Sequence, residues 1–184
     1  MADINNLRPG DMLLVADGTS LVARGIQEFM LQYCKINHYQ YYRLYHHAAL
    51  VVEDRGKIKI AEAIGRGWVI REPLEAYTAE EWIKRVDIYR LQQKLSAIEL
   101  RKLNDLALDY SLKITRYDYA NFIFQMIMIR TGVWLGPKEA KAEGRLYCSE
   151  GVATIYNKIR PSMCEEPWRY NPIDLFLEPG YFKV

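Results

Sequence analysis

The stretch that decides the fold is "HHAALVVEDRGKIKIAEAI", residues 46–64. Two runs rich in apolar and β-branched residues flank a turn centred on Arg55 and Gly56, and this pattern predicts a β-hairpin. With a two-residue turn, Ala49 pairs with Glu62. A turn one residue longer would put Glu62 out of phase, so the face on which Glu62 lies depends on this register.

The predicted hairpin separates the two adjacent histidines. Successive residues of a strand point to opposite faces, so His47 shares a face with Glu62, whereas His46 points to the other face with Ala48 and Leu50. A carboxylate diagonal to His47 can accept a hydrogen bond from one imidazole nitrogen and fix the tautomer of the ring. The alternative is a glutamate at a sheet edge that bends towards solvent.

The second candidate for chemistry is Cys148, in "GRLYCSEGVATIYNKI", residues 144–159. A loop turns into a helix there, and the unpaired amides of a first helical turn favour a thiolate. The small residues Ser149, Gly151 and Ala153 would let this helix pack closely. A buried structural cysteine is the alternative for the segment taken alone, because a nucleophilic thiol needs a base within reach.

The rest of the chain alternates between strand and helix patterns. A Pro9-Gly10 turn opens it, and Leu21, Ile26, Phe29 and Met30 form an apolar helical stripe. Strands are expected within 7–17 and 85–91, helices within 19–35, 78–85, 96–112, 117–132 and 149–159, a loop at 63–69, and a loop followed by a strand within 171–184. Capping boxes are predicted at Thr78 with Glu81 and at Ser96 with Glu99. This alternation predicts an α+β fold with a mainly antiparallel sheet, formed by one domain over residues 1–184.

Composition excludes several classes of protein. A net charge of +2 over 184 residues does not indicate a nucleic-acid partner. Three cysteines cannot form a complete disulfide framework, and no spacing of a metal or cofactor motif occurs, so we expect neither metal nor cofactor. No signal peptide and no apolar run of spanning length are visible, so we expect a protein without a stable membrane anchor, cytoplasmic or phage-associated.

Several stretches occur in an order that resembles a known superfamily. They are "RPGDMLLV", "HHAALVVED", "IAEAIGRGWVI", "YDYANFIF", "LYCSEGVATIY" and "NPIDL". In this order the chain resembles the YiiX-like, circularly permuted branch of the NlpC-type papain-like superfamily, in which the histidine strand precedes the cysteine helix. The resemblance implies a papain-like α+β fold with a small curved antiparallel sheet packed against helices.

The resemblance also implies roles for individual residues. Cys148 matches the nucleophile, His47 the general base and Glu62 the residue that orients the histidine. Asp11 matches an acidic residue at the start of the first strand, with a structural role such as capping a turn.

The substrate expected from the resemblance is a small peptide. Tyr117 and Tyr119 match a Y-D-Y stretch that lines the cleft, and with Ser149 they are the residues expected to bind substrate. Related proteins cleave γ-D-glutamyl–diamino acid bonds of cell-wall peptides, and other permuted relatives act on lipid acyl groups. The cysteine motif of that second group, N-C-E-H, is absent, because Ser149 and Glu150 follow Cys148. A cell-wall endopeptidase is therefore the prediction; a lipid- or acyl-directed relative, or a non-catalytic peptide- or lipid-binding or phage structural protein, is the alternative.

Overall fold

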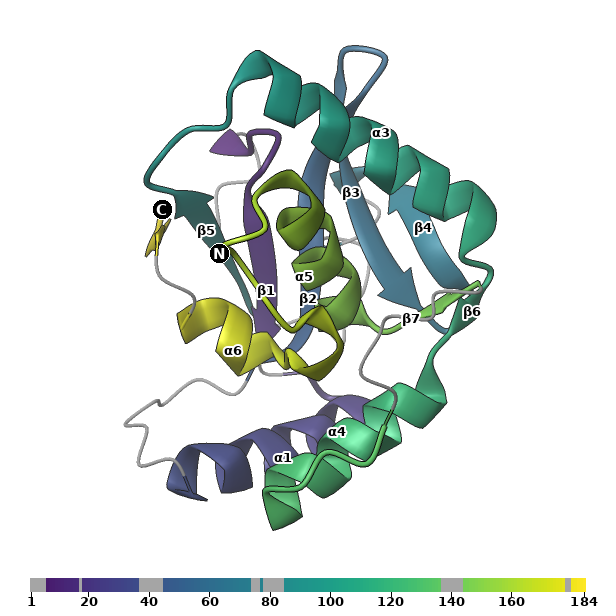
Figure 1. Cartoon of the computed structure of the whole chain (residues 1–184), viewed down its shortest axis with the longest axis vertical. Coiled ribbons are helices and arrows are strands. Elements are labelled where there is room, and N and C mark those ends of the chain that lie inside the picture. Colours follow the sequence, from purple (N-terminus) through teal and green to yellow (C-terminus); the bar gives the residue numbers. More distant parts are fainter. Residues whose placement is uncertain are drawn as a thin grey trace.

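The computed structural model describes residues 6–16, 18–36, 45–73, 77, 85–136, 144–177 and 180–184. An antiparallel sheet of six strands, in the order β4-β3-β2-β1-β5-β8, forms its centre (Figure 1). The strands are β1 (Met12–Ala16), β2 (Tyr45–Asp54), β3 (Lys57–Ile64), β4 (Gly67–Arg71), β5 (Arg85–Leu91) and β8 (Tyr181–Lys183). Two short strands, β6 (Arg116–Tyr117) and β7 (Arg145–Leu146), form a separate parallel pair. The described residues thus form the α+β fold with an antiparallel sheet that the sequence predicts.

The β2–β3 hairpin has the predicted register. Ala49 pairs with Glu62 and Asp54 with Lys57. Both turn residues have positive φ, 52° at Arg55 and 76° at Gly56. This backbone is typical of the two-residue hairpin turn whose twist matches that of the flanking strands, and it fixes the face on which Glu62 lies.

Helices cover one face of the sheet. They are α3 (Ala97–Lys113), α5 (Cys148–Ile159) and the short α6 (Pro172–Leu177), drawn in front of the sheet in Figure 1. The main core lies between α5 and the even-numbered side chains of β2, which include Ala48 and Leu50. A Cβ atom on Gly151 would lie 2.2 Å from the Trp68 ring, so the expected close packing of this helix is confirmed.

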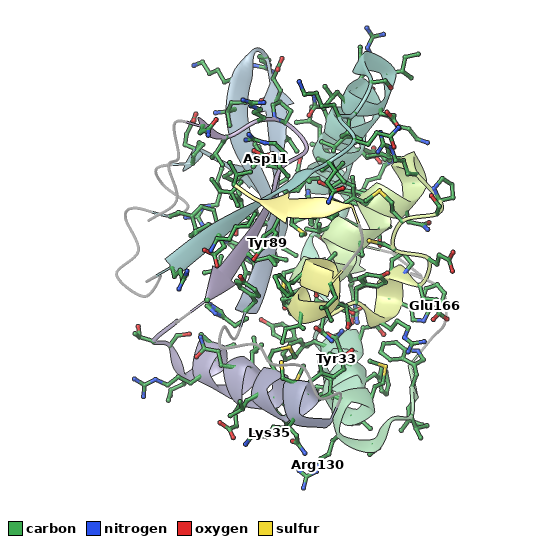
Figure 2. The ribbon with its side chains drawn as sticks, turned by 90° about the vertical axis from the view of Figure 1, so that its left-hand side faces the viewer. Asp11, Tyr33, Lys35, Tyr89, Arg130 and Glu166 are labelled. Carbon is green, nitrogen blue, oxygen red and sulfur yellow. The ribbon has the colours of Figure 1, made fainter. Side chains whose placement is uncertain are left out.

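Two further helices, α1 (Leu21–Ile36) and α4 (Tyr119–Thr131), pack against each other beyond one end of the sheet (Figures 1 and 2). Ile26 and Met30 are buried between them as predicted, but Leu21 is 88% exposed and does not belong to the core stripe. The α4 helix ends at Gly132 as expected. No described helix is both long and apolar enough to cross a bilayer.

The structure corrects the prediction for the last fourteen residues, 171–184. Where a loop was predicted, the α6 helix begins, because the Asn171 side chain accepts hydrogen bonds from the amides of Ile173 (2.8 Å) and Asp174 (3.0 Å). Pro172 occupies the first helical position, where its missing amide costs nothing. The strand predicted after it is present as β8.

A second correction concerns the loop predicted at 63–69, because Gly67 begins β4, which pairs with β3. The Ser96–Glu99 capping box at the start of α3 is confirmed. Residues 78–84, with the predicted capping box of Thr78 and Glu81, lie outside the described residues.

Candidate active site

Cys148, His47 and Glu62 meet at one end of the sheet although they come from three separate elements. The His47 imidazole donates from Nε2 to Glu62 Oε2 at 2.7 Å, and the Cys148 thiol lies close enough to the same ring for each of the two groups to shift the pKa of the other. Since Nε2 is paired with the carboxylate, Nδ1 is the ring nitrogen left for the sulfur. The three side chains therefore form a continuous thiol–imidazole–carboxylate chain.

A β-bulge at the start of β2 lies directly beside His47. Val15 of β1 pairs with His47, but the next residue, Ala16, pairs with Tyr45, so that His46 is the extra residue. Bulges bend a strand and re-aim its side chains, and they occur often beside active sites. The period-two pattern of the sequence gave no sign of this bulge.

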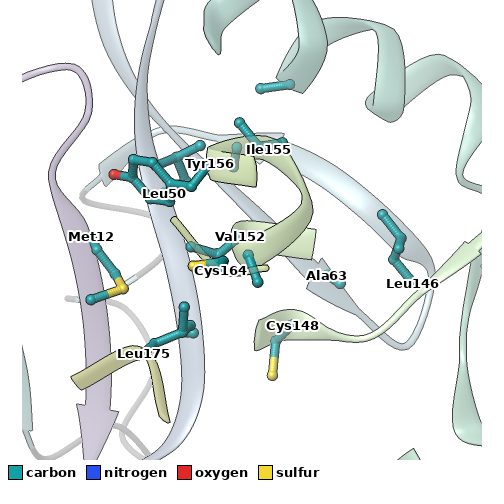
Figure 3. Packing of buried hydrophobic residues seen from close by; sticks show 14 of the residues in the cluster. Met12, Leu50, Ala63, Leu146, Cys148, Val152, Ile155, Tyr156, Cys164 and Leu175 are labelled. Atoms are coloured by element: carbon teal, nitrogen blue, oxygen red, sulfur yellow. The ribbon is translucent and has the colours of Figure 1, made fainter. Parts of the chain in front are cut away.

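The thiol lies where a helix begins. Cys148 is the first residue of α5 and only 3% exposed. Figure 3 shows its side chain at the end of the packed cluster, pointing away from Ile155 and Tyr156. The positive end of the helix dipole therefore lies next to the sulfur, where it favours negative charge.

Each partner changes the proton affinity of the other. Burial on its own would raise the pKa of Cys148, but the charge of His47, its hydrogen bond and the Ala48 amide lower that pKa below its ordinary value. Burial would lower the pKa of His47, but the charge and hydrogen bond of Cys148, with those of Glu62, raise it above its ordinary value. The geometry therefore favours a thiolate–imidazolium pair over a neutral thiol and imidazole.

Glu62 is held by two further residues that sequence reasoning missed. Arg71, the last residue of β4, donates from Nη1 to Glu62 Oε1 at 3.1 Å, and the Tyr77 hydroxyl donates to Oε2 at 3.2 Å. Burial would raise the pKa of Glu62, but His47, Arg71 and Tyr77 lower it, so the carboxylate is charged although it is only 2% exposed. Arg71 was missed because the pairing of β4 with β3, which brings the end of β4 beside Glu62, was not predicted.

The two tyrosines expected at the site differ in their relation to the thiol. The Tyr117 hydroxyl donates to Cys148 Sγ at 3.9 Å, from β6. Tyr119 stacks on Tyr117 with ring centroids 4.9 Å apart, but its side chain is 60% exposed and lies at the mouth of the neighbouring cavity. Both tyrosines line this cavity.

The prediction that Ser149 binds substrate is wrong. Ser149 is fully buried and donates from Oγ to the Tyr170 carbonyl at 2.8 Å, because the second residue of α5 turns into the protein interior. Asp11 has the expected structural position: it accepts from the Arg8 amide at 2.8 Å and forms an ion pair with Arg90 at 2.7 Å.

Glu150 is a buried acid next to the site, in the first turn of α5. Its carboxyl accepts from the Tyr147 amide at 3.3 Å, as the third residue of a capping box does. Burial raises the pKa of Glu150 to about 8, so at neutral pH this carboxyl is mostly protonated.

A cavity of about 210 Å³ lies next to His47 and Glu62. Its walls are mostly apolar, with Val22, Ala23 and Ile26 from α1, Ile64 from β3 and Phe122 from α4. Its polar side chains come from the His47 site itself, from Arg71, from His46 and from Ser20. The cavity is thus a compact, largely apolar space that a substrate group next to the thiol could fill.

Comparison with models of known protein families gives no match, and comparison with curated protein sequences gives none either. Among solved structures, the chain resembles metalloprotein yiiX from Escherichia coli O157:H7, with a TM-score of 0.63 and 18% sequence identity over 96% of each chain. At this identity the likeness shows a common fold over nearly the whole chain. The likeness is consistent with this chain being a relative of yiiX.

That neighbour is described as a metalloprotein, so we compared the residues of this chain with a metal site. Among the described residues, no group of three or more histidine, cysteine, aspartate or glutamate side chains is arranged to hold a metal ion. The described side chains therefore do not fit such a site, and the groups of this site that can carry chemistry are the thiol, the imidazole and the carboxylate.

Proposed function

We propose that this chain is a cysteine hydrolase of amide bonds, with Cys148 as the nucleophile, His47 as the general base and Glu62 as the residue that orients His47. The observation that carries the proposal is the hydrogen bond from His47 to the buried Glu62 carboxylate, with the Cys148 thiol beside the same imidazole. A thiol is activated in this way when a base lies within reach and a third group orients the base.

In the proposed reaction, the Cys148 thiolate attacks the carbonyl carbon and the carbonyl π electrons move to oxygen. The Cys148 amide, at the start of α5, and the Tyr117 hydroxyl are the donors nearest to that oxygen. The His47 imidazolium then gives its proton to the leaving amine as the C–N bond breaks. Water, deprotonated by His47, attacks the thioester and releases the acid and the thiol.

We further propose that the fold is a circularly permuted papain-like fold. Three features support this: the histidine strand precedes the cysteine helix in the chain, α5 packs on the antiparallel sheet, and the chain resembles yiiX over almost its full length. The order His47, Glu62, Cys148 is the order of the permuted branch that the sequence resembles.

The first candidate substrate is a cell-wall peptide with a γ-D-glutamyl–diamino acid bond, on the basis of that resemblance. The cavity favours a second candidate, an acyl ester or amide, because its walls are mostly apolar and its mouth carries exposed apolar side chains, Val22 (71%) and Tyr119 (60%). At about 30 Å³ per water molecule, the cavity holds roughly seven waters, which suits a short apolar group rather than a long chain.

Alkylation by iodoacetamide, measured as a function of pH, tests the nucleophile. We expect the Cys148 thiol to titrate well below about 8.5 and to lose this shift in His47→Ala. The control is Cys148→Ala, in which any remaining alkylation comes from the other two cysteines, Cys34 and Cys164, which are also buried. A Cys148 that titrates normally, or does not react, would contradict the proposal.

The substrate class is tested with two panels, each with Cys148→Ala as control. One panel contains tripeptide and tetrapeptide muropeptides, and the other p-nitrophenyl esters with acyl chains of increasing length. Release of diamino-acid fragments supports the peptidase, and a rate that rises with chain length and then falls supports the acyl candidate. Turnover of neither panel would contradict both candidates.

A further inference from the structure

We infer that Arg71 is a positioning residue of the thiol site, which acts through Glu62 to keep the thiolate and the imidazolium paired. The inference rests on the proposed function, since it concerns the same thiol. It goes beyond that function because Arg71 lies on a strand that carries none of the three proposed catalytic residues.

The charges in the site alternate along the chain of contacts. In its ion-pair form the site holds a negative Cys148, a positive His47, a negative Glu62 and a positive Arg71. Contacts of 2.7 and 3.1 Å join Glu62 to His47 and to Arg71, and Cys148 lies beside the imidazole. Along this chain of contacts between described residues, the four charges sum to zero. Without the guanidinium the same buried site would carry one net negative charge, and an uncompensated buried charge is strongly unfavourable.

Arg71 and Tyr77 contact the same carboxylate with different consequences. Both donate a hydrogen bond to Glu62, but only Arg71 brings a charge. The Arg71 side chain is 22% exposed and that of Glu62 is 3% exposed, so water screens their interaction only in part. We therefore assign the main electrostatic role to Arg71 and a smaller, geometric role to Tyr77.

The other titratable groups near the pair come from the elements packed around it. Tyr117 of β6 and Glu150 of α5 face Cys148, and His46 of β2 is next to His47. Tyr117 is neutral at physiological pH, because burial raises its pKa well above the ordinary value. Glu150 and His46 are likewise mostly neutral near pH 7, since burial raises the pKa of the acid to about 8 and lowers that of the base to about 4.

Loss of Arg71 should therefore raise the pH at which Cys148 becomes a thiolate. If Glu62 stays charged, the site is more negative and a thiolate is less favourable. If Glu62 takes up a proton instead, His47 loses its charged acceptor, and the imidazolium that stabilises the thiolate is weakened. Both routes shift the thiol midpoint in the same direction, upward.

The test is the pH profile of Cys148 alkylation in Arg71→Met, Arg71→Lys and Tyr77→Phe. For Arg71→Met we expect the midpoint to rise by about half to one pH unit, and the alkylation rate at a pH below both midpoints to fall roughly three- to ten-fold. Arg71→Lys keeps the charge, so its midpoint should stay close to that of the wild-type protein. Tyr77→Phe should shift the midpoint less than Arg71→Met does. Circular dichroism and a thermal melt select variants that are folded.

A double-mutant cycle with Glu62→Gln decides whether Arg71 acts through Glu62. We expect Arg71→Met to shift the midpoint of the wild-type protein but to add little in the Glu62→Gln background. An equal shift in both backgrounds, or no shift in folded Arg71→Met, would overturn the inference while the proposed function stands. A wild-type midpoint near 8.5 would overturn the proposed function and the inference together.

Discussion

His46 and His47 are neighbours in the chain and line the same cavity, but their electrostatic surroundings are opposite. His47 faces Glu62 and the thiol, and their charges and hydrogen bonds raise its pKa despite burial. His46 is 4% exposed, and burial, with the charge of His47, lowers its pKa to about 4. The same kind of side chain therefore serves as a charged partner at position 47 and as a neutral, buried residue at position 46.

The surroundings of His46 show why it stays neutral. Its Nδ1 lies 3.3 Å from the Gln27 side-chain amide nitrogen, and its Nε2 has no hydrogen-bond partner within the described parts of the chain. The ring lies so close to Gly18 that a Cβ atom there would be 2.6 Å from His46 Cε1. Among the residues that the structure describes, no anion contacts this imidazole to support a second proton.

Replacing each histidine in turn gives the largest expected effect. For His47→Ala we expect a loss of at least about 10³-fold in kcat/KM on whichever substrate panel is turned over, because base and nucleophile act as one unit. For His46→Ala we expect a loss below about ten-fold, since this ring does not contact the thiol. Equal losses in two folded variants would remove the distinction between the two histidines.

Acid unfolding tests the neutral state of His46. The unfolded chain takes up a proton at this position near pH 6.5, but the folded chain does so only near pH 4. Stability must therefore fall as the pH drops through this window, by about 2 to 3 kcal/mol between pH 7 and pH 4.5. Urea unfolding at the two pH values measures it, and His46→Gln should reduce the difference by that amount. A pH dependence unchanged in this variant would contradict a neutral, buried His46.

Two glycine substitutions give the smallest effects and probe only the packing around His46. Gly18→Ala brings a methyl group within 2.7 Å of the His46 ring, and we expect it to lower stability by about 1 to 2 kcal/mol. The matched control is Gly25→Ala in α1, where no atom lies within 4 Å and the alanine should stabilise the helix by up to about 1 kcal/mol. Thermal melts of both variants provide the comparison, and equal melting temperatures would argue against the tight contact.

The parts of the site that could be predicted from the sequence depend on local rules. The hairpin register followed from Arg55-Gly56, and it placed His47 and Glu62 on one face. The start of the cysteine helix followed from the loop-to-helix pattern before Cys148. Both features depend on turn chemistry and on a period of two or 3.6 residues, which a single sequence displays.

The parts that were missed depend on contacts between distant segments. Arg71 reaches Glu62 only because β4 pairs with β3, and Tyr77 comes from a segment without a clear pattern. Ser149 follows Cys148 directly, but successive residues of a helix point in different directions, and the Ser149 side chain lies in the core. The α6 helix was missed because its start depends on a side-chain cap from Asn171 rather than on an apolar repeat.

Glu150 gives the cysteine helix a property that the α3 helix lacks. In α3, the ion pair with Arg160 and the bonds from Ser96 lower the pKa of the capping Glu99 to about 2, so a carboxylate neutralises the positive start of that helix. In α5 the equivalent Glu150 is mostly uncharged near pH 7, and it satisfies the Tyr147 amide without adding a negative charge. The positive start of α5 is thus left for a single anion, the sulfur of Cys148, and a rise in pH above about 8 would introduce a competing carboxylate in the same first turn of the helix.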